Sequence, residues 1–192
     1  SDIDFLIIVI FKKDKKDFYL NPTLNLSDKE KTIIKNLIKR RIDECLPVQY
    51  LVNKAYFMNE EFFVDKNVLI PRPETELLVK KTEEIIKQNI LEKKDFKILD
   101  IGTGSGCIPI MLAKMFSSEN INFFACDISP KALEIAKKNA QKHNLEDKIK
   151  FVLSDLFSNI HEKFDLIISN PPYIPLHTKE TLQKEVALHE PS

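Results

Sequence analysis

Residues 96–106 read Phe-Lys-Ile-Leu-Asp-Ile-Gly-Thr-Gly-Ser-Gly, an apolar segment that runs directly into three alternating glycines. A short apolar run of this kind predicts a buried strand, and Cys107 to Phe116 continues as a predicted helix. Glycines between a strand and a helix let the backbone turn tightly and approach a ligand closely. Nucleotide cofactors, dinucleotides and sugar phosphates all use similar loops. The loop therefore predicts a ligand site without identifying the ligand.

The chain after this loop alternates strands with helices, which predicts parallel βαβ units in a doubly wound α/β sheet. Ligands of open parallel sheets bind outside the carboxyl ends of the strands. A residue or motif typical of a ligand site stands at the end of each expected strand. These strands and their ends are 96–101 with Gly102 to Gly106, 121–126 with Asp127, 149–153 with Asp155, and 164–169 with Asn170 to Tyr173. We therefore expect the four ends to meet at one edge.

The tetrad Asn170-Pro171-Pro172-Tyr173 suits the binding of a planar NH₂ group. The Asn side-chain oxygen and the carbonyl that follows it can each accept one of the two amide hydrogens. The prolines hold the turn rigid and donate no N–H, and the aromatic ring can stack on the flat target. The tetrad indicates methylation of a carboxamide or of an exocyclic base amine. Taken alone, two prolines could also mark an ordinary loop.

Two details favour S-adenosyl-L-methionine over a dinucleotide as the ligand of the glycine loop. Asp100 stands two residues before the first glycine, and the G-x-G-x-x-G spacing is absent. Asp127 can accept hydrogen bonds from both ribose hydroxyls, a feature shared with dinucleotide folds. Asp155 suits the adenine amine. The alternative is that Asp127 and Asp155 are solvated carboxylates that cap the helices that follow.

Composition limits the classes of protein. The 192 residues, with 43% hydrophobic and 30% charged side chains, suffice for one domain plus a small appendage. Lys plus Arg and Asp plus Glu number 29 each, so no global charge attracts nucleic acid or an anionic membrane. The cysteines lie far apart, so we expect no disulfide framework, no metal site and a cytoplasmic location. The apolar run 5–11 lacks a basic segment before it and is too short to span a membrane. We interpret the start at Ser1 as a cut.

With the segment Ile70-Pro-Arg-Pro-Glu-Thr-Glu76 before the glycine loop and the tetrad after it, the chain resembles the release-factor (protein-(glutamine-N5)) glutamine methyltransferases. Pro47 to Tyr50, with the aromatic residues that follow, also resembles the interdomain link of that family. The resemblance implies a class I S-adenosylmethionine-dependent methyltransferase fold. It also implies methyl transfer to the glutamine of the Gly-Gly-Gln loop of a peptide-chain release factor, in the cytoplasm.

The resemblance also divides the chain and assigns its site. It implies a helical, substrate-recognising N-terminal domain at 1–46, a hairpin linker at 47–73 and a catalytic domain at 74–192. The implied sheet has strand order 3-2-1-4 and is incomplete, since class I sheets continue with further strands. Arg72 and 74–76 either wall the site or join the domains. The implied cofactor-binding residues are Gly102, Thr103, Gly104, Ser105, Gly106, Asp127, Leu156 and Asn170, and the implied substrate-binding residues are Asn170, Pro171, Pro172 and Tyr173. Asp155 joins the predicted cofactor site through its position at the end of the third strand.

Local patterns complete the N-terminal part. Ser27 and Glu30 predict a capping box at the start of an amphipathic helix. Aromatic segments 55–57 and 62–64, separated by Asn59 to Glu61, predict a hairpin. Pro73 is placed to begin the next helix.

Two rival functions remain at this point. The tetrad would serve an N6-adenine or other nucleic-acid amino-methyltransferase equally well, although the neutral charge balance and the lack of an evident aromatic and basic platform disfavour it. The chain could also be a noncatalytic cofactor-fold module that binds a partner protein. None of His143, His161, His177 and His189 lies in a motif, so we expect all four at the surface and no strong general base.

Overall fold

The computed structural model describes residues 2–11, 26–89, 95–171 and 189–191. Pro172, Tyr173 and His177 lie outside these ranges.

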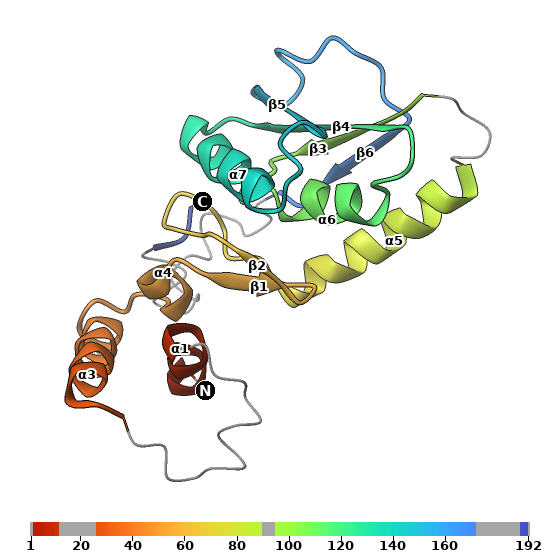
Figure 1. Ribbon diagram of the computed structural model, residues 1–192. Coiled ribbons are helices and arrows are strands. Elements are labelled where there is room, and N and C mark those ends of the chain that lie inside the picture. The colour runs from red at the N-terminus through yellow and green to blue at the C-terminus, as the bar shows by residue number, and fades with distance from the viewer. Residues whose placement is uncertain (1, 12–25, 90–94, 172–188, 192) are drawn as a thin grey trace.

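The N-terminal part consists of the helices α1 (Asp2–Phe11), α3 (Asp28–Asp43) and the short α4 (Val48–Val52). The capping box at the start of α3 is confirmed, since Ser27 Oγ accepts from Glu30 N and the Glu30 side chain accepts from Ser27 N. Arg41 of α3 pairs with Asp2 of α1 at 2.8 Å. The apolar run of the N-terminus is therefore a helix packed in this part (Figure 1). Within the described ranges, no helix has the length and apolar character needed to cross a membrane.

A hairpin of β1 (Ala55–Phe57) and β2 (Glu60–Phe62) follows, with Phe57 paired to Glu60. The expected second strand was placed two residues too late, because Glu60 and Glu61 belong to β2 rather than to the turn. The turn is Met58-Asn59, with φ of 50° and 64°. Two-residue hairpin turns require positive φ, which asparagine adopts more easily than most residues.

The central sheet has the order β5-β4-β3-β6, and every neighbouring pair is parallel. Its strands are β3 (Phe96–Ile101), β4 (Ile121–Asp127), β5 (Ile149–Leu153) and β6 (Leu166–Ser169). The predicted strand order is confirmed. β6 begins two residues later than predicted, because Asp165 is fixed to the start of β3 through Lys97, whose N–H donates to its carboxylate at 2.9 Å.

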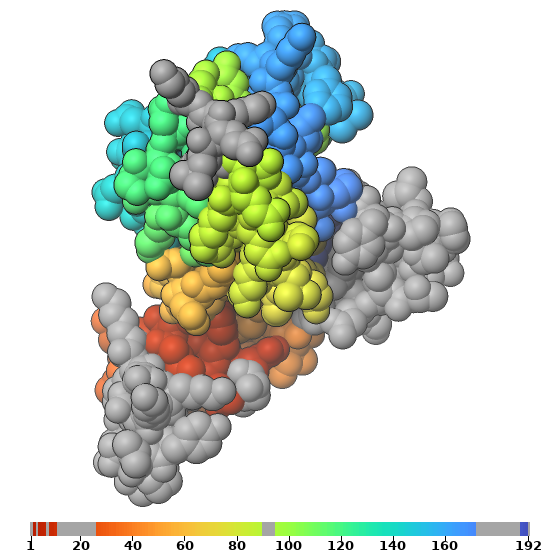
Figure 2. Space-filling view, turned by 90° about the vertical axis from the view of Figure 1, so that its right-hand side faces the viewer, coloured from red at the N-terminus to blue at the C-terminus, as the bar shows by residue number. Residues whose placement is uncertain are grey.

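The helices α5 (Pro73–Asn89), α6 (Cys107–Met115) and α7 (Pro130–Lys142) lie on one face of this sheet (Figure 1). The main core lies between these helices and the sheet and includes Ile86, Ile98 and Ile110. On the opposite face, Leu99 and Phe124 pack against residues of the loop between β5 and β6. Figure 2 shows α5 at the centre of one side of the molecule, with the hairpin below it and the β6 region beside it. The predicted α/β fold class is confirmed. The first turn of α5 contacts both the tip of the hairpin and Asn170, which follows β6.

Candidate active site

The glycine loop and Asn170 leave the sheet side by side. Ile101, the last residue of β3, pairs with Ser169, the last residue of β6. The Ser169 hydroxyl donates to the Ile101 carbonyl at 2.9 Å and fixes the two ends at the same level. The next residues along each strand are Gly102 and Asn170. The structure thus brings together the two motifs that the sequence places far apart.

The loop contains all three glycines of the chain, and each has a positive φ, between 54° and 77°. A side chain would be strained at these angles. A Cβ at Gly102 or Gly104 would meet no atom within 4 Å, so the space around them is open. A Cβ at Gly106 would lie 3.1 Å from the Ala136 side chain, so this glycine allows α7 to approach. The first two glycines therefore leave room for a ligand, and the third serves packing.

Asp127 is held by the loop itself. Its Oδ2 accepts from Gly104 N and its Oδ1 from Ser129 N, both at 2.9 Å. Each carboxylate oxygen can accept more than one hydrogen bond. The half-buried carboxylate is therefore fixed next to the glycines and keeps acceptor capacity for a ligand with hydroxyl groups.

Asp100 lies within β3 and is 1% exposed. Neither of its carboxylate oxygens, nor Thr103 Oγ1, has a hydrogen-bond partner among the residues that the structure describes. Burial raises the pKa of Asp100 to about 7. A buried carboxylate without a partner is costly, so an arriving positive charge would be bound favourably. The sequence analysis used Asp100 only for its spacing to the first glycine. An acidic residue inside an apolar strand is the pattern that could have indicated a role in binding a cation.

An apolar rim borders the ends of β4 and β5. We define it as Ile128, Leu153, Leu156 and Phe157, which are at least half exposed. Asp155 lies exposed in the same turn. Asp127 pairs with Leu153, which brings the rim next to the fixed carboxylate. Ile128, Leu153 and Phe157 were not predicted as site residues, although an apolar residue directly after the strand-end acid Asp127 could have indicated Ile128. Exposed apolar side chains at this position can bind the face of a flat ring.

Asn170 is half-buried, and its Nδ2 donates to Thr75 Oγ1 at 3.1 Å. Pro171 is exposed beside it. The other two residues of the tetrad, Pro172 and Tyr173, lie outside the described residues, so their predicted role stays a prediction. Thr75 belongs to the first turn of α5 and to the range 74–76, for which the sequence left open a role at the site or between the domains.

The segment 70–76 joins separate parts of the chain. Arg72 donates to both carboxylate oxygens of Glu190, at 2.5 and 2.6 Å. Glu76 accepts from Met58 N at the tip of the hairpin, at 2.9 Å. Of the two roles left open for this segment, these contacts support the joining role for Arg72 and Glu76. Glu74 is exposed.

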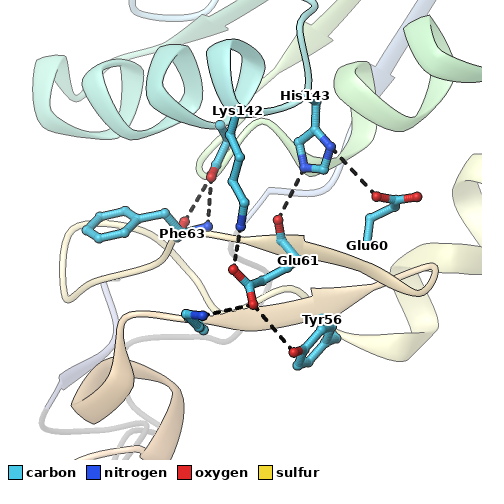
Figure 3. Close-up of polar contacts among 8 residues, drawn as sticks. Tyr56, Glu60, Glu61, Phe63, Lys142 and His143 are labelled. Carbon is cyan, nitrogen blue, oxygen red and sulfur yellow. Dashed lines mark hydrogen bonds and ion pairs between the residues drawn. The ribbon is translucent and has the colours of Figure 1, made fainter. Parts of the chain in front are cut away.

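The hairpin is bound to the glycine loop through Asn139 of α7, which is fully buried. Its Oδ1 accepts from Phe63 N at 2.7 Å, and its Nδ2 donates to Phe63 O and Ser105 O at 2.9 and 2.8 Å. Figure 3 shows Phe63 and, beside it, the ion pair of Lys142 with Glu61 in the same interface.

His143 lies in the same interface, with 8% of its side chain exposed and a ring nitrogen 3.2 Å from the Glu61 carbonyl (Figure 3). The expectation of a surface histidine is wrong here, because the hairpin covers it.

Comparison with known proteins gives matches along most of the chain. The family model of the methyltransferase small domain matches residues 75–189. The release factor glutamine methyltransferase of Dictyoglomus turgidum is 41% identical over 189 residues, which are 96% of this chain and 64% of that protein. The protein of the same name from Chlorobaculum tepidum is 41% identical over 90% of this chain and 60% of its own length. The chain thus spans less than two thirds of these relatives.

Among solved structures, the hMettl16 catalytic domain in complex with MAT2A 3'UTR hairpin 6 aligns with a TM-score of 0.50 and 23% identity. The alignment covers 82% of this chain and 50% of that one. At this level of identity the similarity shows the fold alone.

Proposed function

The chain belongs to the methyltransferase small domain family, and from this premise we propose that it methylates a peptide-chain release factor. The methyl group comes from S-adenosyl-L-methionine, and the acceptor is the side-chain amide nitrogen of the glutamine in the Gly-Gly-Gln loop. The release factor places the reaction in the cytoplasm. In this proposal the helices of residues 1–46 recognise the substrate, residues 47–73 link the domains, and residues 74–192 form the catalytic part.

The observation that carries the proposal is the pairing of β3 with β6, which sets Asn170 directly beside the glycine loop. Methyl transfer requires the methyl donor and the acceptor nitrogen to meet in line. The glycine loop suits the donor, and Asn170 suits the acceptor. The 41% identity to relatives named release factor glutamine methyltransferase supports glutamine as the acceptor.

The residues present fit the cofactor. Open space at Gly102 and Gly104 leaves room for it, and the Asp127 carboxylate has acceptor capacity for ribose hydroxyls. The apolar rim suits a flat base, with Leu156 among its members. Buried Asp100 supplies a carboxylate that can pair with one of the positively charged groups of S-adenosylmethionine. When bound, S-adenosylmethionine would supply a methyl group on a cationic sulfur: an amide nitrogen can take the methyl group, and the sulfur would keep the bonding pair and leave as a neutral thioether.

The chain contributes mainly by positioning the acceptor. An amide nitrogen is a poor nucleophile because its lone pair is delocalised, so its orientation decides the rate. Asn170 Oδ1 and the carbonyl that follows it are acceptors for the two N–H groups of the glutamine amide. Correct placement of two reactants can lower a barrier by roughly 7–11 kcal/mol. The methylated nitrogen is acidic and can lose its proton to water, so no strong general base is required.

Methyl transfer assays with the full-length protein test the proposal. The acceptors would be a release factor, the same factor with the Gly-Gly-Gln glutamine replaced by glutamate, DNA and RNA. We expect transfer only to the unaltered factor, because glutamate has no amide nitrogen. Transfer to DNA or RNA alone would identify a nucleic-acid amino-methyltransferase. Cofactor binding without transfer to any acceptor would identify a binding module.

A further inference from the structure

We propose that Thr75 is a positioning residue that holds the amide of Asn170 in the orientation required for substrate binding. The inference rests on the proposed function, because it concerns the amide group that receives the substrate. The contact is the hydrogen bond from Asn170 Nδ2 to Thr75 Oγ1, at 3.1 Å between residues 95 positions apart.

The orientation of this amide decides what the substrate meets. An Asn side chain has an acceptor oxygen on one side and two N–H donors on the other. With its NH₂ group bound to Thr75, Asn170 turns its oxygen away from α5. Rotation by half a turn would present donors to a substrate amide nitrogen that also carries only donors. The two groups would then repel each other, and the acceptor nitrogen would lose its alignment.

Thr75 is well placed to fix this orientation. It is 7% exposed, so water does not compete freely for its hydroxyl. The first turn of α5 is itself held on both sides, since Thr75 N donates to Arg72 O at 3.0 Å and Glu76 accepts from the hairpin tip at 2.9 Å. The hydroxyl that meets Asn170 therefore belongs to a rigid part of the molecule.

The test compares two substitutions at Thr75 with a matched control on the same helix. Thr75→Val keeps the shape and removes the acceptor, whereas Thr75→Ser keeps the hydroxyl. Thr82, also in α5 and 3% exposed, provides the control Thr82→Val. In the full-length protein we expect Thr75→Val to lower kcat for release-factor methylation by about 10- to 100-fold, as for a misplaced reactive group. KM, cofactor Kd and Tm should follow those of Thr82→Val, and Thr75→Ser should recover most of kcat.

A second measurement does not depend on activity. In wild-type protein the Asn170 side-chain NH₂ signals in a ¹⁵N NMR spectrum should exchange slowly with water, and Thr75→Val should shift them and speed their exchange. Equal kcat for Thr75→Val and Thr82→Val in an active enzyme would overturn the role of Thr75 and leave the proposed function intact. Unchanged Asn170 NH₂ signals in Thr75→Val would overturn it even if no release factor is methylated. If Thr75→Val abolishes the slow exchange but the protein methylates no release factor, the contact is supported and the proposed function is rejected.

Discussion

Replacing Asp100 with asparagine should stabilise the protein at neutral and alkaline pH and have little effect at acid pH. Burial raises the pKa of this carboxyl from 3.8 to about 7. Well below pH 3.8 the group is protonated in both the folded and the unfolded chain. Between the two pKa values the unfolded chain has lost the proton and the folded chain keeps it, so the free energy of unfolding falls as the pH rises. Above the folded pKa the loss is complete.

The size of the effect follows from the pKa difference. The folded and unfolded values of 7 and 3.8 differ by about 3 units. Each unit corresponds to about 1.4 kcal/mol, so the ionised carboxyl destabilises the folded protein by roughly 4 kcal/mol in total. Asparagine carries no charge at any of these pH values. From pH 5 to pH 8, the advantage of Asp100→Asn over wild type should therefore grow by roughly 3 kcal/mol.

Urea denaturation of wild type and Asp100→Asn at pH 5, 6, 7 and 8 measures this growth. Subtraction removes the contribution of groups common to both proteins. His143 is one of them: burial lowers its pKa, so its effect on stability has the opposite sign. A difference in unfolding free energy that stays constant across this pH range would refute the reasoning and show that Asp100 is not a buried, unpaired acid.

Three further substitutions test the site and its support. Asp127→Ala should weaken S-adenosylmethionine binding measured by calorimetry, since each hydrogen bond to a charged group contributes about 1.5–3 kcal/mol; unchanged affinity would remove Asp127 from the site. Asn170→Ala should nearly abolish methyl transfer while Tm is retained and cofactor affinity falls less, whereas normal turnover would contradict the proposed role of the tetrad. Asn139→Ala should lower the free energy of unfolding by about 3 kcal/mol, because the part-buried N–H and carbonyl of Phe63 and the buried carbonyl of Ser105 each lose a partner. An unfolding free energy within about 1 kcal/mol of wild type would show that water or a rearranged hairpin satisfies these groups.

The features that sequence predicted well are those decided by neighbours along the chain. The alternation of strands and helices predicted the parallel sheet correctly, and α3 begins at its predicted capping box of Ser27 and Glu30. The strand ends then had to meet at one edge, because all four strands are parallel. The edge could therefore be predicted before any contact between distant residues was known.

The features that sequence missed depend on distant contacts. His143 is polar and follows a helix, which suits a surface position, yet the hairpin, whose Glu61 carbonyl it meets, covers it. Met58 gives no sign of a positive φ, and its conformation follows from the two-residue turn between β1 and β2. The contact of Thr75 with Asn170 depends on β6, which places Asn170 beside the first turn of α5. In each case the deciding partner lies on another element.

The segment 70–76 illustrates why a motif can be specific without being catalytic throughout. Its polar residues bind three different parts of the molecule: Arg72 holds Glu190, Thr75 holds Asn170 and Glu76 holds the hairpin tip at Met58. Loss of the Arg72 or the Glu76 contact would loosen the start of α5 and, with it, the contact of Thr75 with Asn170. Only Thr75 reaches the proposed acceptor site. The other two residues contribute by keeping α5 where Thr75 can meet Asn170, so their substitution should affect stability and catalysis together, whereas Thr75→Val should affect catalysis with much less effect on stability.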